Sequence, residues 1–156
     1  MTTFPETLEI LAATPEKVRL LVTGADEATL SRRPPGDFFS LRENVAHLRD
    51  VDIDAYEQRV VRVLGEEHPA LADFKGAVVA KERAYHLQDV APALEAFAAS
   101  RQRSVARLRA AGEGALGRTA YLEGVGEVTL GRILELWIQH DREHLADMEA
   151  LRNASQ

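Results

Sequence analysis

Residues 40–65 read SLRENVAHLRDVDIDAYEQRVVRVLG and carry the clearest helix signal in the chain. Ser40 and Glu43 form a capping box: the serine hydroxyl can accept from the backbone N–H of residue 43, and the glutamate can accept from the backbone N–H of residue 40. Apolar residues then recur at helical spacing, namely Leu41, Val45, Leu48, Val51, Ala55, Tyr56, Val60 and Leu64. This pattern predicts one long amphipathic helix that ends at Gly65.

Three further segments show the same periodicity, at residues 7–22, 89–111 and 129–151. Pro15 lies inside the first of them, so it either kinks one helix or starts a second. Thr129 is expected to cap the last helix. Four long helices predict an all-α protein built as a four-helix bundle, in one domain over residues 1–156.

The connections between these helices are expected to hold short extra helices. Residues 26–30 could form a single turn, and residues 70–88 favour helix. Residues 112–126 contain five glycines and show little pattern. We therefore predict a connection there, with a brief extended piece at Tyr121–Leu122.

Composition excludes several classes of function. The 156 residues include 25 acidic and 19 basic side chains, a net charge of -6, so a broad basic surface for nucleic acid is not expected. No stretch of about 18 uninterrupted apolar residues suggests a membrane span, and no signal peptide is apparent, which favours a cytoplasmic protein. The chain has no cysteine, which leaves His, Asp and Glu as metal ligands.

Two of the five histidines lie on the apolar face of the last helix. Ile133, Trp137, His140, His144 and Met148 are spaced four, three, four and four residues apart, so they form one stripe. A buried imidazole needs partners for both ring nitrogens. A shared cation would bind one nitrogen of each ring and leave the other free to donate. The alternative is that one ring lies in the core and the other is exposed, and that each forms hydrogen bonds with the backbone or with water.

His47 is the best third ligand by position, although it lies at the flank of the apolar stripe of its own helix. His68 and His86 are expected to be exposed. Residues 140–144 match the inverted zinc-protease motif H-x-x-E-H, but too little chain follows for its third ligand. The forward motif H-E-x-x-H and a di-iron Glu-x-x-His pair are both absent. A three-histidine site with open coordination positions remains, as in catalytic zinc sites.

At these residues the chain resembles the DinB/YfiT-like superfamily, a group of four-helix bundles that includes bacillithiol S-transferases and mycothiol-dependent maleylpyruvate isomerase. The similarity is one of pattern and spans most of the sequence. It is carried by residues 14–21, the segment FSLRENVAHLRD at 39–50, Phe97 with Arg101, Gly126 with Thr129 and Leu130, and the pairs His140-Asp141 and His144-Leu145.

The resemblance implies that His47, His140 and His144 hold one divalent ion, zinc or nickel, in a homodimeric protein. The chain departs from the family pattern in two places. Asp147 stands where glutamine is frequent, and the region of Leu122 and Glu123 lacks a frequent histidine. These departures do not affect the three metal ligands, but the substrate class of the family does not carry over directly to this chain.

The leading functional hypothesis is a metal-dependent transferase that acts on a low-molecular-weight thiol of the bacillithiol type. Three neutral ligands leave the ion its full charge, which would deprotonate the thiol for attack on a small electrophile. Asp50 and Asp141 are candidate hydrogen-bond or proton acceptors, or else surface carboxylates. Arg101 is a candidate for a substrate carboxylate, or else part of a surface salt bridge. The alternatives are a hydrolase that uses metal-activated water and a non-catalytic metal-binding bundle.

Overall fold

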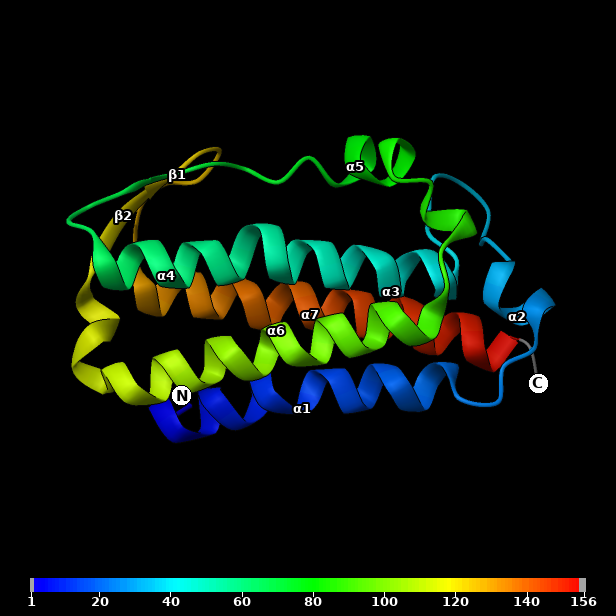
Figure 1. Ribbon diagram of the computed structural model, residues 1–156, viewed down its shortest axis with the longest axis horizontal. Helices are drawn as coiled ribbons and strands as arrows, with labels where there is room; N and C mark the ends of the chain where they lie inside the picture. The colour runs from blue at the N-terminus through cyan, green and yellow to red at the C-terminus, as the bar shows by residue number, and fades with distance from the viewer. Residues whose placement is uncertain (1, 155–156) are drawn as a thin grey trace.

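The computed structural model describes residues 2–154, so Met1, Ser155 and Gln156 of the expected domain lie outside the described residues. Four long helical rods lie side by side (Figure 1), which confirms the predicted all-α four-helix bundle. The rods are α1 (Phe4–Val22), the continuous run of α3 (Leu41–Asp50), η1 (Val51–Tyr56) and α4 (Glu57–Gly65), α6 (Val90–Ala111) and α7 (Leu130–Ala154). Within residues 2–154, no helix combines the length and the apolar character that a membrane span requires.

The rods have an up-down-down-up arrangement. The colours of Figure 1 show that α1 and α7 run in one direction, whereas the α3–α4 rod and α6 run in the other. Because α4 and α6 are parallel, the chain must return along the length of the bundle between them. Residues 66–89 make this crossover and contain β1 (Ala70–Leu71), α5 (Gly76–Glu82) and the short turn η2 (Tyr85–Leu87). The short α2 (Glu27–Ser31) links α1 to α3.

The predicted helix ends are largely confirmed. The Ser40 hydroxyl accepts from the Glu43 backbone N–H at 3.2 Å, and the Glu43 carboxylate accepts from the Ser40 N–H at 3.0 Å. The Thr129 hydroxyl accepts from the backbone N–H of Arg132 at the start of α7. Pro15 lies within one continuous helix, which settles the alternative in favour of a single α1.

Two predictions about local structure were incomplete. The segment 40–65 is not one uniform α-helix, because η1 is a π-helical turn in which the Glu57 N–H donates to the Asp52 carbonyl. The connection at 112–126 holds more than a brief extended piece: β2 (Thr119–Leu122) and β3 (Gly126–Thr129) form an antiparallel hairpin, with β1 parallel to β2. Alternate residues of β2 are buried against the bundle, a period-two pattern too short to stand out in the sequence.

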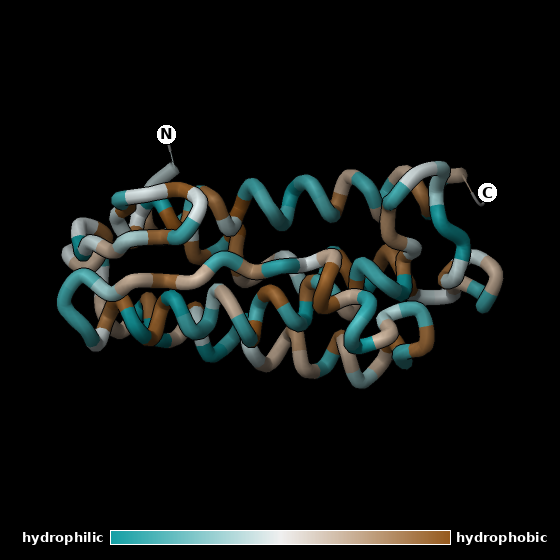
Figure 2. The backbone as a smooth tube through the Cα atoms, turned by 90° about the horizontal axis from the view of Figure 1, so that it is seen from above, coloured by the Kyte–Doolittle hydropathy of each residue, from teal (hydrophilic) through white to brown (hydrophobic). Residues whose placement is uncertain are grey.

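A buried polar layer divides the core of the bundle. Figure 2 shows hydrophobic and hydrophilic residues alternating along the rods, as expected of amphipathic helices. One apolar cluster surrounds Trp137 towards the hairpin, and another surrounds Phe97 and Met148 towards the C-terminus. Between them lie side chains that are polar and yet buried, namely Thr14, Asp52, Ser100, Arg101, Ser104 and Asp141.

Arg101 is the centre of this layer. Its guanidinium is 1% exposed and donates to the Asp52 carboxylate at 2.9 Å, to the Asp141 carboxylate at 2.8 and 3.1 Å, and to the Leu11 carbonyl at 2.8 Å. The Thr14 hydroxyl also donates to Asp141. One buried cation therefore connects α1, η1, α6 and α7.

We predict that Arg101→Gln lowers the free energy of unfolding by about 3–5 kcal/mol, because it leaves two buried carboxylates without their counter-ion. Urea unfolding of the purified variant measures this change. The matched control is Arg103→Gln on the same helix, whose side chain is 48% exposed in its pair with Glu57. That control should cost less than about 1 kcal/mol, and equal losses in the two variants would refute a special role for Arg101.

Candidate metal centre

Three imidazole rings from two helices converge in the bundle. His47 comes from α3, and His140 and His144 come from α7. One nitrogen of each ring lies within 4.8 Å of the others, and no further histidine, aspartate or glutamate of residues 2–154 belongs to this cluster. His47 is 7% exposed, so it faces inward although the helical wheel left its direction open. The structure thus brings together all three residues that the sequence singled out, and we call them the histidine cluster.

Burial keeps these rings neutral. Desolvation, helped by the nearby His144, lowers the pKa of His47 to about 3. The same causes, with the charge of His47 added, lower the pKa of His140 to about 2. Burial lowers the pKa of His144 as well. At neutral pH each ring therefore carries one lone pair that can bind a cation.

Asn44 fixes the orientation of one ring. Its side-chain oxygen accepts a hydrogen bond from His144 Nδ1 at 2.8 Å, and its amide nitrogen donates to the Ser40 carbonyl at 3.0 Å. An amide oxygen can only accept, so Nδ1 of His144 carries the proton and Nε2 presents its lone pair to the cluster. Sequence reasoning missed Asn44, although it lies one turn before His47 on the same helix.

The donor set fits a divalent cation. Nε2 of His47 and Nε2 of His140 are 3.2 Å apart, and two nitrogens bound to one tetrahedral zinc ion at 2.0–2.1 Å lie roughly 3.3–3.4 Å apart. Nδ1 of His47 and Nδ1 of His140 are buried and have no hydrogen-bond partner within residues 2–154. Two neutral rings that face each other can share only one proton, whereas a cation would use both lone pairs.

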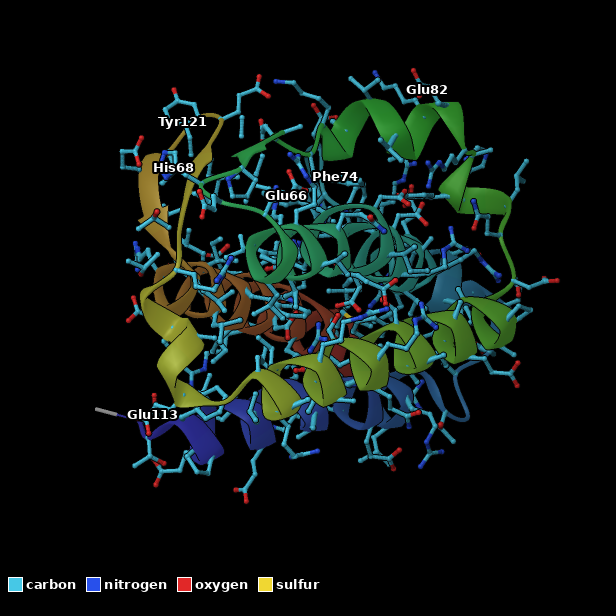
Figure 3. The ribbon with its side chains drawn as sticks, turned by 60° about the vertical axis from the view of Figure 1, so that its left-hand side comes forward. Glu66, His68, Phe74, Glu82, Glu113 and Tyr121 are labelled. Carbon is cyan, nitrogen blue, oxygen red and sulfur yellow. The ribbon has the colours of Figure 1, made fainter. Side chains whose placement is uncertain are left out.

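The crossover packs against His47 and closes one side of the cluster. The Phe74 ring lies 6.2 Å from the His47 ring between centroids, and the Phe39 ring lies 5.2 Å from it on α3's N-terminal side. Figure 3 shows Phe74 on the segment that covers the α3–α4 rod. A Cβ at Gly76 would lie 3.0 Å from Cε1 of His47, so a larger residue there would require the His47 ring to shift by a few tenths of an ångström.

The other side of the cluster opens into a cleft through His140. The cleft has a volume of about 270 Å³ and lies where α4, α7, the crossover and the hairpin meet. The Tyr56 ring stacks on Trp137 with centroids 4.8 Å apart and lies 6.0 Å from the His140 ring. The lining consists of Tyr56, Arg59, Asp73, Leu122, Glu123, Val125, Ile133, Leu136, Gln139, His140 and Glu143.

Asp50, Asp141 and Arg101 do not line this cleft. The candidate roles of Asp50 and Asp141 as hydrogen-bond or proton acceptors, and of Arg101 as the partner of a substrate carboxylate, stay predictions. Asp50 is buried and accepts from Arg49 and from the Tyr85 hydroxyl at 2.7 Å; burial opposes its ionisation, but these hydrogen bonds outweigh burial and lower its pKa. Asp141 and Arg101 bind each other in the buried polar layer. We therefore interpret all three as residues that position helices, and none is a surface carboxylate or surface salt bridge.

The two remaining histidines lie away from the cluster. His68 is exposed at the hairpin end of the bundle (Figure 3), where its ring contacts Thr119 and Glu127. His86 is exposed in η2. Both placements agree with the prediction from the sequence.

We predict that Asn44→Ala weakens the binding of a divalent ion roughly 10–100-fold, because His144 loses the acceptor that orients it. Calorimetric titration of chelator-treated protein with zinc chloride measures this affinity. Asn44→Asp should restore binding, since a carboxylate oxygen can accept the same hydrogen bond. An affinity that is equal in wild type and Asn44→Ala would contradict this role.

We also predict that metal-free protein loses stability as the pH falls below about 6.5, where histidines of the unfolded chain take up protons. The folded rings stay neutral in this range because the pKa values of His47 and His140 are about 3 and about 2. Each such histidine contributes a slope of roughly 1.4 kcal/mol per pH unit, with stability rising as the pH rises.

Urea unfolding between about pH 6.5 and pH 5 tests this dependence. His140→Asn should show a shallower slope, whereas His86→Asn, which lies outside the cluster, should keep the slope of the wild type. A slope that His140→Asn leaves unchanged would show that the cluster is not its source.

Comparison with known proteins places this geometry in a family. The family model of the DinB superfamily matches residues 10–148. Among solved structures, YfiT from Bacillus subtilis, described as a probable metal-dependent hydrolase with an unusual four-helix bundle topology, superimposes with a TM-score of 0.89. The two chains are 20% identical, and the match covers 99% of this chain and 90% of YfiT. No curated protein matches the chain significantly. Since the family model spans most of its length, the chain belongs to the DinB superfamily.

Proposed function

We propose that this protein is a metal-dependent hydrolase of a small ester or amide, with a divalent ion held by His47, His140 and His144. The observation that carries the proposal is that three neutral imidazoles, and no fourth ligand from residues 2–154, converge beside a cleft. Three protein ligands with an open position are typical of catalytic zinc sites, whereas structural sites are closed by four. The description of YfiT as a probable metal-dependent hydrolase supports the same reaction class.

A divalent ion in this position would polarise the substrate carbonyl and lower the pKa of water. The neighbouring residues orient the ligands, pack against them and leave one side open. Asn44 orients His144. Phe39 and Phe74 pack against His47 and exclude water from that side. The cleft leaves His140 accessible to a small molecule.

Transfer of a low-molecular-weight thiol to an electrophile is the second candidate, because the same ion would lower the pKa of a thiol. The absence of cysteine favours it to the extent that the chain has no thiol of its own to compete for the ion. Zinc or nickel as the metal, a homodimeric assembly and a cytoplasmic location stay predictions that accompany both candidates.

We predict that purified protein binds one equivalent of zinc or nickel, that His144→Ala abolishes binding, and that His86→Ala leaves it unchanged. Elemental analysis and melting temperatures with and without added metal measure this. Replacing one of only three ligands removes a large share of the affinity, whereas His86 is exposed and outside the cluster. Absence of bound metal, with no rise in melting temperature on its addition, would refute the proposal.

The reaction class requires a separate assay on the metal-loaded protein. A panel of small esters and amides is incubated without thiol and, in parallel, alkylating electrophiles are incubated with bacillithiol, mycothiol or glutathione. Hydrolysis that needs no thiol and is lost in His144→Ala supports the leading candidate. Turnover only with a thiol would reject hydrolysis in favour of transfer.

A further inference from the structure

Arg59 is a buried cation without a direct ion pair among the described residues. It lies in the first turns of α4 and is 8% exposed. Its Nη2 donates to the Ala72 carbonyl at 3.1 Å, and Nε is buried without a hydrogen-bond partner. No carboxylate of residues 2–154 makes a direct ion pair with it, and the nearest acidic influence is the charge of the exposed Asp73. Because an isolated buried charge is costly, such a group is expected to have an anionic partner.

The contrast with Arg101 makes this feature specific. Arg101 is also buried, but it forms ion pairs with Asp52 and Asp141. Burial lowers the pKa of Arg101, but the effect of the two carboxylates is larger, so the pKa is raised. For Arg59, burial is the largest effect and the pKa is lowered, although Tyr56 and Asp73 oppose this change. The fold therefore pairs one buried guanidinium directly with two carboxylates, whereas the other has no direct ion pair and is stabilised by the Tyr56 side chain and by the charge of the exposed Asp73.

Arg59 lies in the cleft beside the histidine cluster. Its guanidinium carbon is 4.9 Å above the Tyr56 ring, whose centroid is 6.0 Å from the ring of His140. Both Arg59 and His140 line the cleft. A small molecule that reaches His140 can therefore place a second group against Arg59.

Acidic side chains line the same cleft, but they lie at its rim. Asp73, Glu123 and Glu143 are exposed, and Glu123 accepts from the backbone N–H of Asp73. Among the described residues that line the cleft, Arg59 is the only arginine or lysine. These carboxylates disfavour a dianion such as phosphate more than a monoanion, since repulsion grows with ligand charge.

We propose that Arg59 binds the carboxylate of the substrate, so that the natural substrates are small carboxylic acids that carry an ester or amide bond. The planar guanidinium matches a carboxylate in two parallel hydrogen bonds. The inference rests on the proposed function for the reaction at the histidine cluster. Recognition of the anion depends on Arg59 alone and can be measured without metal.

The test compares N-acetylglycine with N-acetylglycinamide, which share a scaffold and differ in the carboxylate. Dissociation constants are measured by NMR titration of chelator-treated, 15N-labelled protein, so that the ligand cannot bind through a metal ion. Wild type should bind the acid roughly 10–100-fold more tightly than the amide, as expected for a charge-assisted pair. The signals that move should belong to α4 and the hairpin around the cleft.

Arg59→Gln should abolish this preference, and Arg59→Lys, which keeps the charge, should retain part of it. The matched control is Arg62→Gln on the same helix, whose side chain also donates to a crossover carbonyl but is paired with Glu66 in solvent. It should bind like wild type. Circular dichroism of each variant establishes that the helices are intact.

Equal affinity of wild type for the acid and the amide would overturn the inference, as would a preference that survives in Arg59→Gln. Tighter binding of inorganic phosphate than of N-acetylglycine would overturn the carboxylate assignment. The proposed function fails independently: protein that binds no zinc but shows the Arg59-dependent preference would refute the metal centre and leave the anion site standing.

Discussion

A guanidinium at the centre of a helical bundle must be neutralised by carboxylates, because its desolvation without them costs several kcal/mol. Arg101 meets this requirement with Asp52 from η1 and Asp141 from α7. These two elements adjoin the residues that carry the histidine cluster: Asp141 follows His140 directly, and Asp52 lies five residues after His47. One buried ion network therefore fixes the relative position of the two helices on which the cluster depends.

The histidine cluster and the buried polar layer differ in how their side chains are charged. In the layer, a permanent cation is matched by two carboxylates within the fold. In the cluster, burial has removed the charge from the rings and has left lone pairs that face one another. In the first arrangement the fold itself supplies the counter-charges of Arg101, whereas the second gains most from an added cation. Arg59, a buried cation without a direct ion pair, likewise gains most from a partner that the fold does not supply, in this case an anion in the cleft.

Much of this arrangement could be predicted from the sequence, because it depends on local rules. The capping box at Ser40, the four helical periodicities and the shared stripe of His140 and His144 are properties of single segments. The direction of His47 is not such a property, since its helix is interrupted by the π-helical turn η1 and its ring is enclosed by Phe74 and Gly76 from the crossover. The burial of Asp141 and Arg101 likewise depends on contacts between helices far apart in the sequence.

If His47, His140 and His144 bind one ion and leave coordination positions open, the ligands of that ion can be identified. X-ray absorption spectroscopy of the zinc-loaded protein measures the ligands directly. Three imidazole nitrogens are expected at about 2.0–2.1 Å, together with at least one oxygen ligand that the protein does not supply. A spectrum with one imidazole or none, or with a first shell of oxygen ligands alone, would contradict this expectation.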